Sequence, residues 1–565
     1  MATVGTPQYI KERCTSLQNN WTARDKKFKD WYNILLLVDE LEQPEMESVA
    51  TNDPRTGFNL AKHLLISMII AHKIPSDGLT PEEVSATSYL ESYISKRWTE
   101  QENRYRQMGR QSLLSELVGW ILATGWYSIF AMADKDRTWV DVWSPAECFP
   151  EFGSDGLVEH AHIYTLSVAA ARKKFLSMGL PVPLNLQGRV GGKGITFYDH
   201  WSFDYDGDVA NAIVAGSDWL KFPVKDPEMS KLGRLPIFTS PVGGLPDLGA
   251  LTSGGKWQEH YGESIIATNE DLNKNYNRMR SFYQQAARSA AQHHWLELST
   301  GESEIATDEA MRRWGSVLHG APGESVSAIQ PPAIPVELTN IMYTYQNELQ
   351  RGLFPSAVFG NVQQQMSYLA MANIASASLQ VLTPYIDAIK GLLSDIDNFL
   401  VDRIITSSDR PYKFSKPKDL PDDHKFDVTA SVEIPGYLVQ RATVAKMLNP
   451  TFKLPESWIT ERMFPEIKNV LESQAEVRKE TAMMHPKAII VDQILTYRAQ
   501  AQLLRKANDI ASAELYEKLA TSLEAELAPP QAPQAPPPTQ GEVPMRQEVQ
   551  PKEIMAPIES LGRAQ

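Results

Sequence analysis

Two glycine-rich stretches that contain a lysine are the first candidates for chemistry, because the backbone N–H groups of such loops can surround a phosphate. They are Gly188–Gly194 (GRVGGKG) and Ser253–Trp257 (SGGKW). Neither has the G-x-x-x-x-G-K-[ST] spacing, and Gly194 or Trp257 stands where a magnesium-binding hydroxyl is required. We therefore predict ordinary loops at both places and no cofactor.

A cluster of carboxylates is the second candidate. Asp204, Asp206 and Asp208 have the spacing that begins a calcium-binding loop. Val209 stands where such a loop needs glycine for its sharp turn, and Ala215 replaces the bidentate glutamate. The pattern therefore favours a β-hairpin turn over a calcium site.

Histidines supply the third candidate. The close pairs are His160/His162 and His293/His294, and neither has a nearby set of cysteines or carboxylates that would complete a tetrahedral zinc site. We predict no metal site. The sequence also contains no G-x-S-x-G or H-E-x-x-H motif, so no motif identifies the chain as an enzyme.

Charge and composition restrict the class of protein further. The chain has 565 residues with 55 Lys and Arg against 69 Asp and Glu, which gives a net charge of −14. A protein that binds nucleic acid strongly over its whole surface must neutralise many phosphates, so an excess of acidic residues argues against such binding. The net charge leaves open a protein along which nucleic acid slides.

The sequence has only two cysteines, Cys14 and Cys148, which cannot form a disulfide framework. This predicts a reducing cytoplasm or a particle assembled in one. The longest apolar run, Leu64–Ala71, is too short to span a membrane.

The first half of the chain changes from helical to β-rich. Periodicity predicts helices over Trp21–Val38, Phe58–Lys73 and about Pro81–Ala123, with the turn residues Thr51–Gly57 between the first two. The stretch Gly125–Pro246 is rich in Gly, Pro, aromatic and β-branched residues. We predict short strands there, interrupted by one helix at about Ser167–Met178 and joined by a hairpin at Asp206-Gly207.

The second half is mainly helical. From Trp257 to Ala291 an apolar seam recurs at alternating spacings of four and three residues, formed by Leu272, Tyr276, Met279, Tyr283, Ala286 and Ala290. A short strand module, a second helix at Val336–Leu353 and a long helical tract at Met366–Ile405 follow. Pro384 lies inside that tract, where proline removes a backbone donor and predicts a kink. Helices separated by prolines cover Tyr437–Leu527, and the Pro-rich Ala528–Gln565 is predicted to be a disordered tail.

This order of elements resembles the portal protein of tailed bacteriophages, in particular of podovirus-like phages. The residues that carry the resemblance are Tyr261-Gly262-Glu263, Asn269–Asn277 (NEDLNKNYN) and the alanine-rich Gln284–Ala291, which resemble the start of the first stem helix in that family. Asn52–Asn59 (NDPRTGFN), followed by an apolar helix, resembles the N-terminal region of the family.

The resemblance implies a mainly helical α+β fold with a wing, a stem, a clip and a helical crown, assembled as a ring. The implied parts are a helical and β-rich wing at 1–256, the first stem helix at 257–291, the clip at 292–335, the second stem helix at 336–353, the tunnel loop at 354–365, a kinked spine helix and wing return at 366–436, the crown at 437–527 and the tail at 528–565.

The resemblance also implies a structural function rather than an enzymatic one. A homo-oligomeric ring, usually of twelve copies, would form the channel for double-stranded DNA at one capsid vertex of the virion, after assembly in the host cytoplasm. Its implied partners are the large subunit of the terminase motor, the head–tail adaptor, and the major capsid and scaffolding proteins, with no membrane. A phage-associated enzyme that acts on nucleic acid or the cell wall, and a minor capsid protein without a channel, remain alternatives.

Two groups of residues follow as candidate sites under this resemblance. Residues that could face the DNA channel are Lys274, Arg278, Arg288, Gln363, Gln364 and Gln365. The basic ones could equally belong to a solvated helix face, whereas the glutamines can touch phosphates without holding them. Arg312 and Arg313, beside Trp314, form the paired basic site of the clip and could dock acidic groups of the motor or adaptor, with salt bridges between subunits as the competing use.

Overall fold

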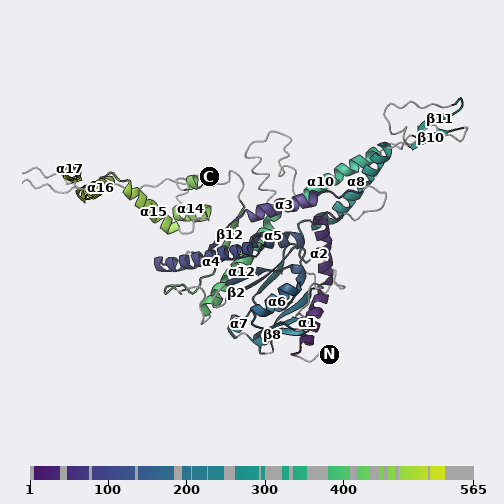
Figure 1. The fold of residues 1–565 in the computed structure, drawn as a ribbon, viewed down its shortest axis with the longest axis horizontal. Coiled ribbons are helices and arrows are strands. Elements are labelled where there is room, and N and C mark those ends of the chain that lie inside the picture. The colour runs from purple at the N-terminus through teal and green to yellow at the C-terminus, as the bar shows by residue number, and fades with distance from the viewer. Residues whose placement is uncertain are drawn as a thin grey trace, which may run out of the picture. The chain divides into compact units, whose positions relative to one another are not determined.

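The computed structural model describes most of the chain, and Figure 1 shows its elements. The described residues are 5–38, 48–75, 79–133, 138–183, 194–204, 206–225, 227–246, 261–291, 294–299, 321–329, 335–352, 380–406, 414, 417–432, 442, 444–448, 456–464, 470–506 and 509–527. The chain divides into two compact units, unit 1 (Met1–Val470) and unit 2 (Leu471–Gln565). Within the described ranges, helices predominate over strands, as predicted, and no helix is long and apolar enough to cross a membrane.

Unit 1 begins with five helices: α1 (Pro7–Asn20), α2 (Thr22–Leu35), α3 (Asp53–Ile66), α4 (Pro81–Gln107) and α5 (Leu113–Thr124). Their starts follow local sequence, because Thr80 forms a capping box with Glu83 at α4 and Ser112 caps α5. The third helix differs from the prediction of a helix over Phe58–Lys73. It starts at Asp53, with Pro54 in its first turn, and ends at Ile66. Residues Ile69–Lys73 form strand β1 instead, which pairs with β12 (Asp427–Ser431).

Two antiparallel sheets confirm the predicted β-rich region. Strands β2 (Trp126–Ala133), β3 (Thr138–Val142) and β9 (Ile237–Pro241) form a sheet in the order β3-β2-β9. A second sheet has the order β4-β5-β6-β7-β8, with the strands β4 (Cys148–Gly153), β5 (Gly156–Leu166), β6 (Ile195–Phe203), β7 (Val209–Ala215) and β8 (Asp218–Lys225). Helix α1 covers one face of this sheet, and α6 (Val168–Ser177), the predicted helix within this region, packs on it through Phe175 and Phe197. The short helix α7 (Pro227–Leu232) precedes β9.

Helix α12 (Thr383–Thr406) contributes an apolar stripe to the core of unit 1. Ile389, Leu393, Ile396, Leu400 and Ile404 are all buried. Residues 366–379 of the predicted tract lie outside the described residues. The described part corrects the position of Pro384, because a 3-10 turn at Gln380–Leu382 precedes α12. The proline therefore stands in the first turn of a helix and not in its interior, where its missing N–H would have broken a hydrogen bond.

The helix predicted over Trp257–Ala291 also starts later than expected. Helix α8 spans Glu270–Ala291 and not Trp257–Ala291. The backbone N–H of Glu263 donates to the carbonyl of Val242 (3.1 Å) and that of Ile265 to the carbonyl of Leu122 (3.0 Å), so these groups are not part of a helical hydrogen-bond ladder. Gly262 has φ +88°, which an α-helix does not allow.

A close approach of two backbones fixes this junction. Gly125 ends α5 with φ +67°, and a Cβ at that position would lie 2.3–2.5 Å from backbone atoms of Glu263. The indole N–H of Trp126 donates to the carbonyl of Tyr261 (2.7 Å). The Tyr261-Gly262-Glu263 sequence thus attaches the segment before α8 to the end of α5 and the start of β2.

Helices α8 and α10 (Val336–Gly352) form a hairpin, with strands β10 (His294–Leu298) and β11 (Ser325–Ile329) paired beyond its far end (Figure 1). Helix α10 agrees with the predicted helix Val336–Leu353 to within one residue. We call the end of the hairpin near Glu270 and Gly352 its foot.

The remaining described helices are α14 (Glu456–Met463) in unit 1 and α15 (Val470–Met483), α16 (Pro486–Lys506) and α17 (Ile510–Leu527) at or beyond the unit boundary. They confirm helices between the predicted prolines. The boundary between the compact units falls after Val470, whereas the predicted crown begins at Tyr437.

Candidate functional site

The hairpin is amphipathic in the way that its sequence predicts. Tyr276 of the predicted seam is buried, and Leu272, Met279, Tyr283 and Ala286 are half-buried. Leu349 of α10 is buried in the same hairpin. Helices α8 and α10 thus pack against each other, and Tyr276 also lies close enough to Asp53 of α3 to feel its charge.

Glu270 anchors the foot of α8 to α2. Its carboxylate accepts a hydrogen bond from the indole of Trp31 (2.9 Å) and lies 3.4 Å from Lys27 Nζ and 3.2 Å from Lys274 Nζ. Burial alone would raise the pKa of Glu270, but the hydrogen bonds from Trp31 and Lys274 and the charges of the two lysines outweigh it and lower that pKa. The carboxylate is therefore ionised at neutral pH and fixes α8 against α2.

Polar side chains at intervals of four residues hold the foot to its surroundings. Asn269 donates to the carbonyl of Leu349 (3.0 Å), Asn277 Oδ1 accepts from the backbone N–H of Thr51 (3.0 Å), and Ser281 Oγ accepts from that of Val49 (3.0 Å). Sequence reasoning missed this role. The signal was present in the spacing, because Asn269, Asn273, Asn277 and Ser281 lie on one face of a helix.

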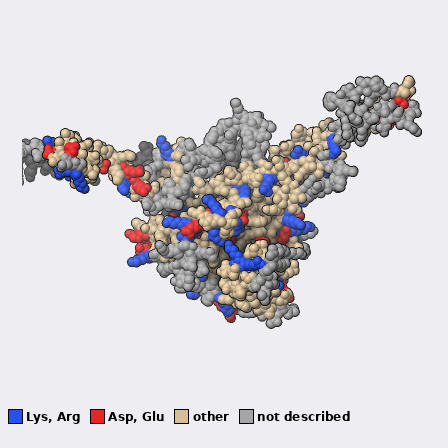
Figure 2. Space-filling view, viewed as in Figure 1, with Lys and Arg blue, Asp and Glu red and all other residues tan. Residues whose placement is uncertain are grey.

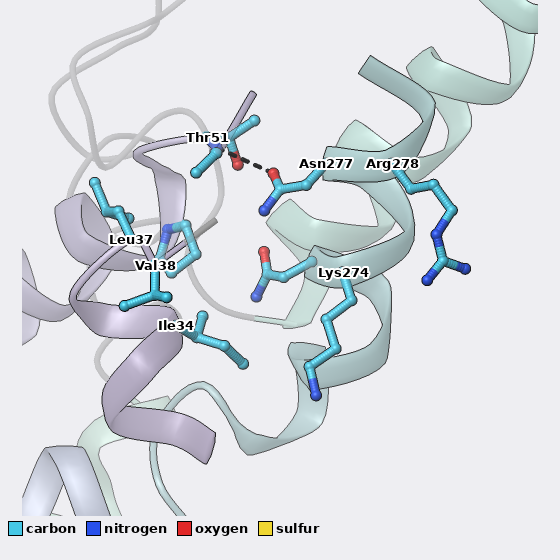
Figure 3. A pocket seen from close by; sticks show the side chains of 10 residues that line it. Ile34, Leu37, Val38, Thr51, Lys274, Asn277 and Arg278 are labelled. Atoms are coloured by element: carbon cyan, nitrogen blue, oxygen red, sulfur yellow. Dashed lines mark hydrogen bonds between the residues drawn. The ribbon is translucent and has the colours of Figure 1, made fainter. Parts of the chain in front are cut away.

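A small pocket of about 40 Å³ lies at this foot, between α8, the end of α2 and the segment before α3 (Figure 3). Apolar side chains and two basic residues line it together with three polar ones: Ile34, Leu37, Val38, Ala50, Thr51, Pro54, Asn273, Lys274, Asn277 and Arg278. Asn273 is only 3% exposed, and its amide has no hydrogen-bond partner among the described residues.

The basic residues predicted to face a channel all lie on α8. Lys274 is half-buried and paired with Glu270, whereas Arg278 and Arg288 are exposed. Lys274 and Arg278 both line the pocket, although the Arg278 side chain points away from Thr51 and Val38 in Figure 3. Arg288 lies ten residues further along the helix. In the view of Figure 2, Lys and Arg side chains stand out over the middle of unit 1 and along the hairpin.

The other predicted site residues fall outside the described residues. They are the glutamines Gln363, Gln364 and Gln365 and the clip residues Arg312, Arg313 and Trp314. Their proposed roles therefore remain predictions from the sequence.

The carboxylate cluster holds a lysine of its own chain. Asp204, Asp206 and Asp208 surround the ammonium of Lys225 at 2.6, 2.9 and 3.2 Å. The backbone N–H groups of Asp206 and Asp208 both donate to Asp204 Oδ1 (2.9 Å), which closes the turn between β6 and β7. The predicted hairpin turn is thus confirmed, and Lys225 occupies the position that a cation would take.

The histidine pair of β5 is buried between the two sheets. His160 is fully buried with no hydrogen-bond partner at either ring nitrogen in the described structure, and His162 stacks on Trp143 with 3.9 Å between the ring centroids. Burial lowers the pKa of both histidines, that of His160 strongly, so both are neutral at pH 7. Of the other pair, His293 is outside the described residues and His294 begins β10.

Comparisons with known proteins identify no family. No family model matches the sequence, and no curated protein matches it. Solved structures that are similar are the neck of the native gene transfer agent particle computed with C12 symmetry (11% identity, TM-score 0.38) and the neck of the empty particle computed with C6 symmetry (12% identity, TM-score 0.41). A third is the virion of the native particle (12% identity, TM-score 0.40). Each covers 73% of this chain and 90% of the other chain.

Proposed function

We propose that this chain is the subunit of a portal-like ring at one vertex of a phage-like capsid, and that double-stranded DNA passes through the ring during packaging and ejection. The observation that carries the proposal is the exposed apolar surface of the α8–α10 hairpin. The exposed fractions are 46% for Phe282, 40% for Ile341 and 63% for Tyr343. Val336 is also exposed, as are Leu296, Leu298 and Ile329 of the strand pair beyond the hairpin.

Apolar side chains exposed on several sides of one hairpin indicate contacts with other molecules. Helices α8 and α10 have 22 and 17 residues and can pack against each other along one seam only. The isolated hairpin therefore has a small hydrophobic core. Packing each hairpin between two neighbouring copies would cover both outer faces, and repetition of one such contact by rotation closes a ring. This arrangement accords with the resemblance of the element order to portal proteins.

Within this proposal the channel is passive toward DNA. The net charge of −14 disfavours tight binding to DNA, and sparse basic residues such as Arg288 can still centre the duplex, since their fields are screened within about 8 Å. Gln363, Gln364 and Gln365 would line the bore. Lys274 and Arg278 both line the pocket at the foot of the hairpin.

Electron microscopy of the purified full chain tests the ring. We expect rings with a central hole, and monomers or small dimers at micromolar concentration would contradict the proposal. Ile341→Asp should abolish rings, because it places a charge in the proposed contact. Leu176→Asp is the matched control, since Leu176 is 64% exposed on α6 and outside the hairpin, and it should leave rings intact.

The docking role of the clip needs an assay of its own. Changing Arg312 and Arg313 to glutamate reverses the charge that we propose meets acidic groups of the packaging motor and later of the tail adaptor. Rings should form, and capsids that contain them should fail to fill with DNA. Normal filling would exclude the docking role, and loss of rings would assign the arginines to contacts between subunits.

A further inference from the structure

A short segment before α3 lies along α8 and is held by side chains of that helix. We call this segment, Val49–Thr51, the strap. The backbone N–H of Thr51 donates to Asn277 Oδ1 (3.0 Å, dashed in Figure 3), and that of Val49 donates to Ser281 Oγ (3.0 Å). The strap therefore runs antiparallel to α8, because its later residue meets the earlier residue of the helix.

The spacings of the strap and the helix match, so the same two donors could be accepted one turn away. Alternate residues of an extended chain are about 6.6 Å apart and face one side. Residues four apart on a helix are separated by about 6 Å along the axis and lie on one face. The polar face of α8 continues beyond Asn277, because Asn273 stands one turn nearer to Glu270.

The position one turn away has an acceptor without a donor. Asn273 is 3% exposed, and its amide group has no hydrogen-bond partner among the described residues. The buried hydroxyl of Thr51 also has no partner there. Both residues line the pocket of about 40 Å³ at the foot, so there is free space beside the strap and next to Asn273. A shift that brings the Thr51 N–H to Asn273 Oδ1 would satisfy this acceptor.

Leaving the observed position costs little at either end of the strap. Ser281 Oγ also donates to the carbonyl of Asn277 (2.9 Å), a bond within α8 that remains when Val49 leaves. At the other end, Asn52 precedes α3 without a side-chain cap, so the first turn of α3 can fray. Leu37 lines the same pocket with φ +58°, and such backbone strain is typical of switch regions.

We propose that the strap has a second register on α8, one helical turn closer to Glu270. In this register the N–H of Thr51 donates to Asn273 Oδ1 and that of Val49 donates to Asn277 Oδ1. Both donors keep a partner, and Ser281 is released. The strap and α8 thus have two relative positions about 6 Å apart along the helix axis. This device lies within one chain and does not depend on the ring proposed above.

Distances between two spin labels on the full chain test the second register. The labels are attached at Asn52→Cys, next to the strap, and at Gln284→Cys on α8, both of which are exposed positions. Native Cys14 and Cys148 are buried and stay unlabelled. An excess of unlabelled chain keeps distances between copies out of the measurement. The second register should lengthen the distance by up to about 6 Å, because the strap moves away from Gln284.

Two variants should shift the balance in opposite directions. Ser281→Ala removes an acceptor that only the observed register uses, so the population with the longer distance should rise about two- to tenfold relative to the shorter one. Asn273→Ala removes an acceptor that only the second register uses, so the longer distance should disappear. Asn275→Ala is the matched control, because Asn275 is an exposed asparagine of the same helix, and its distances should equal those of the parent chain.

Three results would overturn the proposal. The first is a single distance that is the same in the parent chain, in Ser281→Ala and in Asn273→Ala. The second is a broad distribution without a second maximum in Ser281→Ala, which would mean that the strap detaches and does not change register. The third is a shift of equal size in Asn275→Ala. None of these results bears on the ring, which electron microscopy of the same chain tests separately.

Discussion

At the scale of single residues, the charged groups between α1 and the five-stranded sheet show how strongly burial determines the role of a side chain. Glu159 is held by Arg13, whose Nε lies 2.9 Å from its Oε1, and by His200 at 2.6 Å. Burial would raise the pKa of Glu159, but the hydrogen bonds from Arg13 and His200 outweigh it and lower that pKa to about 2. The ion pair therefore stabilises the fold at neutral pH and joins two elements 146 residues apart in sequence.

Replacement of this carboxylate should be costly. Glu159→Gln removes the negative charge that Arg13 and His200 contact. We expect the free energy of unfolding at pH 7 to fall by about 1–3 kcal/mol. Glu151→Gln is the matched control, because Glu151 contacts the same arginine (2.7 Å) but its side chain is 49% exposed. Its loss should be under about 1 kcal/mol. Urea unfolding measures both, and equal losses would contradict the role of burial.

The lowered pKa of Glu159 also predicts how its contribution to the free energy of unfolding changes with pH. Its folded-state pKa of about 2 lies below the ordinary value of 4.5, so the unfolded chain binds more protons between these values. Its contribution is present above pH 4.5 and is lost as the pH falls toward 2. The difference in unfolding free energy between the parent chain and Glu159→Gln should therefore shrink as the pH falls below 4.5. A difference that is constant from pH 7 to pH 3 would exclude this linkage.

At the scale of elements, helix boundaries were decided by what the backbone groups do elsewhere. Residues before Glu270 have a composition that is compatible with a helix. The backbone N–H groups of Glu263 and Ile265 nevertheless donate to the carbonyls of Val242 and Leu122, so no helix forms there. Asp53 and Pro54 have turn chemistry, yet they form the first turn of α3, where proline loses no hydrogen bond. Pro384 follows the same rule at α12.

The position of Pro384 changes what its replacement should do. Proline in a helix interior costs about 3 kcal/mol, so an interior site predicts a large gain for Pro384→Ala. In a first turn, proline has the right φ and no donor to lose, and it restricts the unfolded chain. Pro384→Ala should therefore be neutral or slightly destabilising, by up to about 1 kcal/mol. Denaturant unfolding measures it, and stabilisation by 2 kcal/mol or more would place the proline within a continuous helix.

At the scale of the whole molecule, the chain separates into parts with different amounts of core. Unit 1 has a continuous core that extends from α1 through both sheets to α12. The α16–α17 pair buries Ile494 and Ala501 with Ala513 and Ala520, while Leu495, Leu503 and Leu515 are exposed. Its helices end at Leu527, where the Pro-rich stretch Ala528–Gln565 begins.

This division predicts that the end of the chain is dispensable for assembly. The composition of Ala528–Gln565 offers too little apolar surface to offset the entropy of ordering it. A chain truncated after Leu527 should form the same rings as the full chain, at the same concentration, as measured by light scattering. Soluble monomers from the truncated chain would show that a packed element had been removed.

The sequence by itself determined the features that depend on neighbours along the chain. The apolar seam of α8 and the hairpin turn at Asp206-Gly207 were readable, because periodicity and turn residues act within a few positions. The absence of a complete metal or nucleotide motif was readable for the same reason. The break between α4 and α5 was not, since one helical stretch was predicted over about Pro81–Ala123.

Only the tertiary structure decided what distant groups do to one another. It ended α3 at Ile66, because Ile69–Lys73 found a partner in β12 more than 350 residues away. It placed Lys225 among three aspartates and surrounded Glu159 with Arg13 and His200. It also brought Asn273 and Asn277 against the end of α2, where they form a pocket. Such contacts depend on where hydrogen-bonding and charged groups meet after folding. Spacing along the chain can place residues on one face of a helix, but it does not specify which distant groups that face will contact.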